Sequence, residues 1–215
     1  MASNKKSNVY VIAEAGVNHN GNIKKAIELI DISKKAGADC VKFQIYDSTK
    51  LSTPLNKLAP YQKLNTKFST QSDMLKKYQL NEYNLTKLYN HAKKIKIDFL
   101  CPPFDIDSIK LLISIGLKKI KIPSGEITNF PYLRVLGKYN CDLILSSGMS
   151  NLEEIKKAIE ILTINGTKKN KITVLHCTSD YPAKFNELNL NAIKSLKTKL
   201  DLNIGYSDHS VGYEA

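Results

Sequence analysis

The chain has 215 residues, of which 42% are hydrophobic and 24% charged, the composition of a soluble globular protein with room for one sizeable core. No apolar run approaches the roughly 18 residues that a membrane span needs. The N-terminal Met-Ala-Ser-Asn-Lys-Lys has no apolar segment behind its lysines, so we expect no secretory signal, no membrane partner and a cytoplasmic location.

The formal net charge of +12 raises nucleic acid as a partner. However, Arg134 is the only arginine in the sequence, and bidentate recognition of phosphate and guanine favours arginine. The lysines are also spread along the chain. We therefore do not expect a nucleic-acid partner.

The cysteines are far apart and form no C-x-x-C pair. This spacing predicts reduced thiols in the core of a cytoplasmic protein, and neither a disulfide framework nor a zinc site. They are Cys40, Cys101, Cys141 and Cys177.

Apolar runs typical of buried strands alternate with helical spacings along the whole chain. The strands are expected at 9–13, 39–45, 97–101, 120–122, 142–146, 172–176 and 202–206. Helices are expected at 23–36, 84–94, 106–115, 131–139, 152–162 and 189–200. Asn22 and Asp105 are expected caps, and Ser150 with Glu153 predicts a capping box. Residues 46–80 form a long connection with a short helix at 74–78.

This alternation predicts an α/β fold with a parallel sheet covered by helices. The absence of a Gly-rich dinucleotide turn favours a (β/α)8 TIM barrel over a doubly wound sheet. The sequence supplies seven strands, so we expect a barrel that is truncated after strand 7. Residues 9–215 would form this incomplete catalytic domain, and residues 1–8 a disordered tail.

The stretch 119–126 (KIKIPSGE) combines a short strand with a polar turn. Pro123 ends the strand because it has no backbone donor. Lys121 points the opposite way from Ile120 and Ile122, and a lysine on an otherwise apolar strand requires an anionic partner. Polar residues also follow the other strands, and a barrel brings these ends together. Lys42, Lys121, several serines and the amides of Gly125 and Gly148 therefore suit a small anion such as a phosphate-carboxylate.

Several motifs resemble the sialic acid synthase family, in order and spacing, from about Val9 to the last residue. They are 12–21 (IAEAGVNHNG), 41–44 (VKFQ), 103–105 (PFD), 121–126 (KIPSGE), 145–149 (LSSGM), 176–182 (HCTSDYP) and 205–210 (GYSDHS). The subfamily looks like the bacterial N-acetylneuraminate or legionaminate type. The family's fold is a (β/α)8 barrel followed by an antifreeze-like domain, and the eighth strand and that domain are not in this sequence.

The resemblance implies a transferase that condenses phosphoenolpyruvate with an open-chain N-acetylhexosamine, either N-acetylmannosamine or a 2,4-diacetamido-hexose. The products are a nine-carbon α-keto acid and phosphate. It implies that Glu126 and Glu14 lie near the reacting carbons, Gln44 and Tyr181 near the sugar, and His209 on a metal. The positions that match phosphoenolpyruvate-binding ones are Lys42, Lys121, Ser124, Ser146, Ser179 and Ser207.

The resemblance further implies a divalent metal, manganese first with magnesium or cobalt as alternatives, held by His209 and a second histidine on strand eight. It implies a homodimer of the full-length form. We expect the 215-residue chain to be inactive by itself. Two alternatives stay open at this point: a phosphoenolpyruvate-dependent aldose-phosphate synthase, which one arginine disfavours, and a non-catalytic basic fragment that binds nucleic acid.

Overall fold

The computed structural model describes residues 9–53, 55–59, 62–63 and 67–212. The tail expected at 1–8 lies outside the described residues. Within them, no helix is both long and apolar enough to cross a membrane. All of the cysteines are buried and none is paired, as the sequence predicted.

The described strands are all parallel and pair in sequence order within two sheets, β1-β2-β3 and β4-β5-β6-β7. Strands β3 and β4 lie side by side, so the two sheets follow one another around the same wall. The strands are β1 Ile12–Gly16, β2 Cys40–Phe43, β3 Asp98–Leu100, β4 Lys119–Ile122, β5 Asp142–Ser146, β6 Ile172–Cys177 and β7 Asn203–Ser207. Strand β1 begins three residues later than 9–13, because Val9 and Val11 are exposed.

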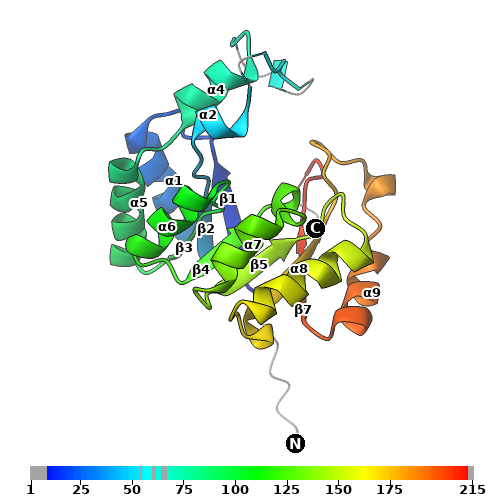
Figure 1. Ribbon diagram of the computed structural model, residues 1–215. Coiled ribbons are helices and arrows are strands. Elements are labelled where there is room, and N and C mark those ends of the chain that lie inside the picture. The colour runs from blue at the N-terminus through cyan, green and yellow to red at the C-terminus, as the bar shows by residue number, and fades with distance from the viewer. Residues whose placement is uncertain (1–8, 54, 60–61, 64–66, 213–215) are drawn as a thin grey trace, which may run out of the picture.

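Helices cover the outer face of the strands (Figure 1). The described helices are α1 Ile23–Lys35, α2 Ser48–Leu51, α4 Gln71–Tyr78, α5 Glu82–Lys94, α6 Ile106–Ser114, α7 Phe130–Gly137, α8 Leu152–Ile164 and α9 Asn191–Leu200, and of these α2 and α4 do not lie on the outer face. Asn22 and Asp105 cap α1 and α6 as expected. The capping box before α8 was predicted one residue too early, since Asn151 and Glu154 form it.

The strands alternate between two apolar environments, as the period-two rule requires. Ile120, Ile122, Leu143 and Leu145 pack with the helices in the main core. On the strands, the residues that alternate with such outward-facing ones face the inside of the barrel. Among these, Cys40, Leu100, Ile144 and Leu175 form a second cluster inside the barrel, with Ile12 against it.

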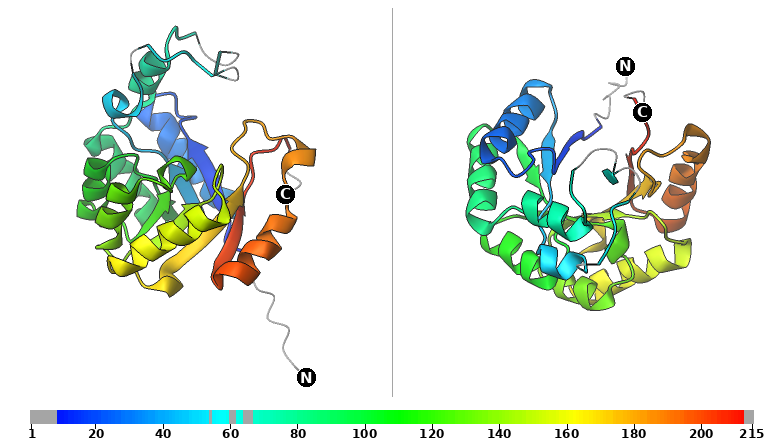
Figure 2. Two further views of the ribbon diagram at one scale, coloured as in Figure 1. Left: turned by 45° about the vertical axis from the view of Figure 1, so that its right-hand side comes forward. Right: turned by 90° about the horizontal axis from the view of Figure 1, so that it is seen from above.

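Seen along the strands, the helices form an outer arc around the inner strands, with β1 and β7 at its two ends (Figure 2). Among the described residues, β1 pairs only with β2 and β7 only with β6. This arrangement confirms the expected barrel through strand 7.

The connection after β2 leaves the barrel wall and carries α2 and α4 at the top of Figure 1. Tyr46 Oη donates to the Leu75 carbonyl over 3.2 Å, which joins the base of the connection to α4. Lys50 Nζ lies 2.6 Å from Asp107 at the start of α6.

The short helix predicted at 74–78 corresponds to the second half of α4, and α2 was not predicted.

The N-terminal end of the barrel holds a small polar cluster of Tyr10, Asp98 and Lys119. Lys119 Nζ lies 2.8 Å from Asp98 Oδ2, 2.7 Å from Tyr10 Oη and 4.1 Å from the centre of the Tyr10 ring. Tyr10 Oη also donates to Asp98. Lys119 is thus paired, in contrast to the second lysine of the same strand.

Candidate functional site

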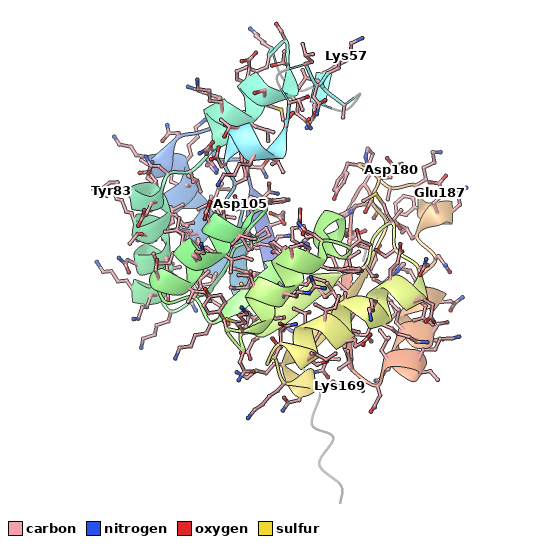
Figure 3. The ribbon with its side chains drawn as sticks, in the orientation of Figure 1. Lys57, Tyr83, Asp105, Lys169, Asp180 and Glu187 are labelled. Atoms are coloured by element: carbon pink, nitrogen blue, oxygen red, sulfur yellow. The ribbon has the colours of Figure 1, made fainter. Side chains whose placement is uncertain are left out.

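The side chains predicted for the site gather at the C-terminal ends of the strands. Figure 3 shows this polarity: Asp180 and Glu187, from the loop after β6, lie at the upper end of the molecule, and Lys169, just before β6, lies at the lower end. The carboxyl ends of parallel strands are where ligands bind in such folds.

Two lysines face the barrel interior near this end. Lys42, on β2, forms an ion pair with Glu14 on β1. Lys121, on β4, is half-buried, and no ion pair is found for it among the described residues. Burial, and then the charge of Lys42, lower the pKa of Lys121 to about 8. An anion placed between the two ammonium groups would relieve this unfavourable burial of charge.

Three of the serines predicted for the site lie at the ends of β4, β5 and β6. Ser124 Oγ accepts from Gly148 N–H over 3.1 Å and lies 3.4 Å from Cys177 Sγ. Ser179 Oγ occupies the space where a Cβ at Gly148 would lie. Ser146 Oγ is buried and has no hydrogen-bond partner among the described residues. An unsatisfied buried hydroxyl is costly, so this donor fits a bound anion.

The Gly148 amide was predicted to contact phosphate, and this prediction is wrong. Its N–H donates to Ser124 Oγ, so the Gly148 amide fixes the position of this serine. Gly125 remains exposed after β4. Ser147, the residue after Ser146, donates to the Leu175 carbonyl over 2.9 Å and has a structural role.

His209 lies after β7 with its ring fixed by the backbone. Its Nδ1 is 2.6 Å from the Thr178 carbonyl oxygen, so Nδ1 carries the proton and Nε2 keeps its lone pair. Nε2 lies 3.4 Å from Ser207 Oγ, and the Tyr181 ring packs 4.3 Å from the His209 ring. Burial lowers the pKa of His209. The predicted residues Ser207, Tyr181 and His209 are therefore brought together.

The arrangement of His209 is the one that a metal-binding imidazole has, with a backbone acceptor on the opposite nitrogen. Among the described residues, no group of three or more His, Cys, Asp or Glu side chains could hold a metal ion. His209 therefore fits as one ligand of a site that needs others.

The two carboxylates predicted near the reacting carbons lie on different strand ends. Glu126 ends the 3-10 turn Ser124–Glu126 after β4, and its Oε2 accepts from Asn129 Nδ2 over 2.7 Å. Glu14 is occupied by Lys42. Gln44 follows β2 and is half-buried.

The remaining histidines have structural contacts. His176 Nε2 lies 2.7 Å from the Leu188 carbonyl oxygen, as expected for a core histidine. His19 is fully buried, and its ring lies against Phe43. His91 Nε2 lies 2.7 Å from Asp31 Oδ1, which joins α5 to α1.

Three site residues were missed. Cys177 contacts Ser124, the Thr178 carbonyl orients His209, and Asn129 holds Glu126. The sequence carried a signal for Cys177, since it lies two residues after the inward-facing Leu175 and ends the same strand. The other two depend on backbone and turn geometry, which the sequence pattern does not show.

We expect Gly148→Ala to weaken anion binding. The new Cβ would overlap Ser179 Oγ and lie 2.9 Å from Ser124 Oγ and 3.0 Å from Cys177 Sγ, so both hydroxyls must move. One lost charge-assisted hydrogen bond, about 1.5–3 kcal/mol, corresponds to at least a tenfold loss of affinity. Calorimetry with phosphoenolpyruvate measures this, and wild-type affinity would show that the crowding is relieved without cost. In a thermal-unfolding control, Gly125→Ala should be tolerated, since its Cβ meets nothing within 4 Å.

The family model described as the NeuB family matches residues 29–215. The chain belongs to the NeuB family. A NeuB-family relative from Campylobacter jejuni, N,N'-diacetyllegionaminic acid synthase, is 50% identical over 94% of this chain and 61% of its own length. The protein of the same name from Legionella pneumophila is 41% identical over 99% of this chain and 63% of its own length. The chain thus spans somewhat more than three-fifths of these curated relatives.

A solved structure supports the same assignment. The N-acetylneuraminic acid synthetase from Leptospira borgpetersenii, crystallised with citrate, superposes with a TM-score of 0.83 at 32% identity. The match covers 96% of this chain and 67% of that chain. The NeuB-family barrel is therefore present here from its first to its seventh strand.

Proposed function

We propose that the protein condenses phosphoenolpyruvate with an open-chain N-acetylhexosamine to give a nine-carbon α-keto acid and phosphate. The observation that carries the proposal is Lys121, a partly buried lysine without an ion-pair partner in the described residues, beside Lys42 and the unsatisfied hydroxyl of Ser146. This set suits a small ligand with several negative charges. The NeuB-family relatives bear names of sialic-type acid synthases, which supports the reaction class.

Each residue has a role in this reaction. Lys42 and Lys121 hold the phosphate and carboxylate of phosphoenolpyruvate, and hydroxyls donate to their oxygens. The enol carbon attacks the sugar aldehyde carbon, water adds to the adjacent cationic carbon, and phosphate leaves from the resulting tetrahedral carbon. Glu126 orients that water or stabilises the cation. The donating hydroxyls are those of Ser124, Ser146, Ser179 and Ser207.

Gln44 and Tyr181 are assigned to the sugar in the same proposal, and Glu14 keeps Lys42 in place while lying near the reacting carbons. His209, through Nε2, would be one ligand of a divalent metal, for which manganese is our first choice. Such a metal would polarise the sugar aldehyde as a Lewis acid. A cytoplasmic homodimer completes the proposal.

The proposal is tested by incubating a form of the protein that spans the full length of its NeuB-family relatives with phosphoenolpyruvate, manganese and either N-acetylmannosamine or a 2,4-diacetamido-hexose. We expect release of inorganic phosphate that requires a sugar, together with a nine-carbon acid by mass spectrometry. The names of the two relatives favour the diacetamido sugar. Phosphate release without any sugar would contradict the proposal. A lack of phosphate release with both sugars would also contradict it.

Phosphoenolpyruvate binding should weaken above about pH 8. Lys121 has a pKa of about 8 without a ligand, so it loses its charge as the pH rises through that value. An anion favours the charged form, so the dissociation constant should rise by up to about tenfold per pH unit, with proton uptake on binding. Calorimetry at about pH 7 and 9.5, in two buffers of different ionisation enthalpy, measures both effects. Equal affinity at the two pH values would show that Lys121 does not contribute its charge to binding of the anion.

A further inference from the structure

The hydroxyl of Ser124 is contacted from two neighbouring strand ends. Gly148 N–H, in the loop after β5, donates to its oxygen over 3.1 Å. Cys177 Sγ, at the end of β6, lies 3.4 Å from the same oxygen. Gly148 and Cys177 are both buried. One serine oxygen therefore connects the ends of β4, β5 and β6.

The hydrogen-bonding capacity of a hydroxyl limits how these contacts can be made. A serine oxygen has one proton to donate and two lone pairs. The Gly148 N–H occupies one lone pair. Either the thiol donates to the second lone pair and the serine proton is free, or the serine proton is directed to the sulfur and only a lone pair remains. A bound anion accepts hydrogen bonds and cannot donate, so only the first arrangement serves it.

We propose that Cys177 is a positioning residue for anion binding: its S–H donates to Ser124 Oγ and thereby directs the serine proton toward the anion that Lys121 binds. Lys121 interacts electrostatically with both Cys177 and Lys42, so the thiol, the serine and the two ammonium groups belong to one cluster. The inference rests on the proposed function, in which the anion is phosphoenolpyruvate. A thiol is a weak donor, so its effect is on the direction of a stronger bond.

The inference predicts different results for two substitutions of the same side chain. Cys177→Ala removes the donor and should raise the KM for phosphoenolpyruvate by about three- to tenfold, with kcat within about twofold. Cys177→Ser keeps a donor and should remain within about twofold of the wild type in both constants. Should Cys177→Ala fail to fold, Cys177→Val, which keeps apolar volume and has no donor, takes its place.

A double-mutant cycle with Ser124→Ala separates positioning from packing. Because Cys177 acts through Ser124, Cys177→Ala should have no further effect on the KM once Ser124 is alanine. An equal effect in both backgrounds, or wild-type behaviour of Cys177→Ala, would overturn the inference, as would a loss in Cys177→Ser as large as in Cys177→Ala.

Two control variants distinguish failure of the inference from failure of the proposed function. Ser124→Ala and Lys121→Met should each weaken phosphoenolpyruvate binding, measured by calorimetry. If they do and Cys177→Ala does not, only the inference is lost. If Ser124→Ala and Lys121→Met both leave phosphoenolpyruvate binding unchanged, the anion site itself is misassigned and the proposed function is lost with it.

Discussion

Replacing Lys121 by Met is expected to weaken phosphoenolpyruvate binding strongly and, at the same time, to stabilise the fold. The ammonium is partly buried beside Lys42, and this burial lowers its pKa to about 8. Met has a similar volume and no charge, so it removes the unfavourable burial without a large cavity. Loss of a charge-assisted contact costs about 1.5–3 kcal/mol, which corresponds to roughly a 10- to 150-fold rise in the dissociation constant.

The gain in stability should depend on pH with a definite sign. The pKa of Lys121 falls from 10.5 in the unfolded chain to about 8 in the folded one. The resulting penalty on folding is therefore complete below about pH 8 and disappears as the pH rises toward the unfolded value. At pH 7 it is at most about 3 kcal/mol, or several degrees in the melting temperature. The advantage of Lys121→Met should shrink between about pH 8 and 10.

Lys119→Met is the matched control, since it changes the other lysine of the same strand. Lys119 is paired with Asp98 at 2.8 Å and contacts Tyr10, at the opposite end of the barrel. This variant should leave phosphoenolpyruvate affinity unchanged and should not stabilise the protein. Lower stability of Lys121→Met, or an equal loss of affinity in the two variants, would contradict our assignment of Lys121.

Glu126→Gln is expected to lower turnover by about 10²- to 10⁴-fold, the range of general acid–base groups. Glutamine keeps the shape of the side chain and can still accept from Asn129 Nδ2, which now lies 2.7 Å from Glu126 Oε2. The fold and the affinity for phosphoenolpyruvate should therefore stay at wild-type values. Steady-state kinetics, with calorimetry for binding, measures the two effects separately.

The control for Glu126 is Glu153→Gln on α8, which changes an exposed carboxylate paired with Lys156 in the next turn. We expect it to have wild-type turnover. If Glu126→Gln also turns over within a few-fold of the wild type, the carboxylate is structural and serves mainly to hold Asn129.

The fold could be predicted from the sequence because its signals are local. Continuous apolar runs with period-two alternation place Ile120 and Ile122 outward and Lys121 inward, as the structure shows. The errors came from competition between neighbouring residues. Ser150 and Asn151 are both good caps, each with a glutamate three residues later, and the structure uses Asn151 with Glu154. The apolar run begins at Val9, before Ile12, which is the first residue that pairs with β2. Strand β1 therefore starts later than predicted.

The site could be predicted as a set of residues but not as a set of contacts. Strand-end position was enough to bring Ser124, Ser146, Ser179 and His209 to one end of the barrel. Which donors remain available depends on distances between loops that are far apart in sequence. The Gly148 amide is therefore used internally, and Glu14 is paired with Lys42. The full burial of His19 likewise results from loop packing that no local pattern encodes.

The central claim is that phosphoenolpyruvate binds between Lys42 and Lys121 at the C-terminal ends of the strands. A crystal structure of the protein with phosphoenolpyruvate tests it most directly. We expect the phosphate and carboxylate oxygens within hydrogen-bond distance, about 2.7–3.2 Å, of both ammonium groups, with Ser146 Oγ donating to one of them. Ligand density elsewhere, with neither ammonium group in contact with it, would contradict the account.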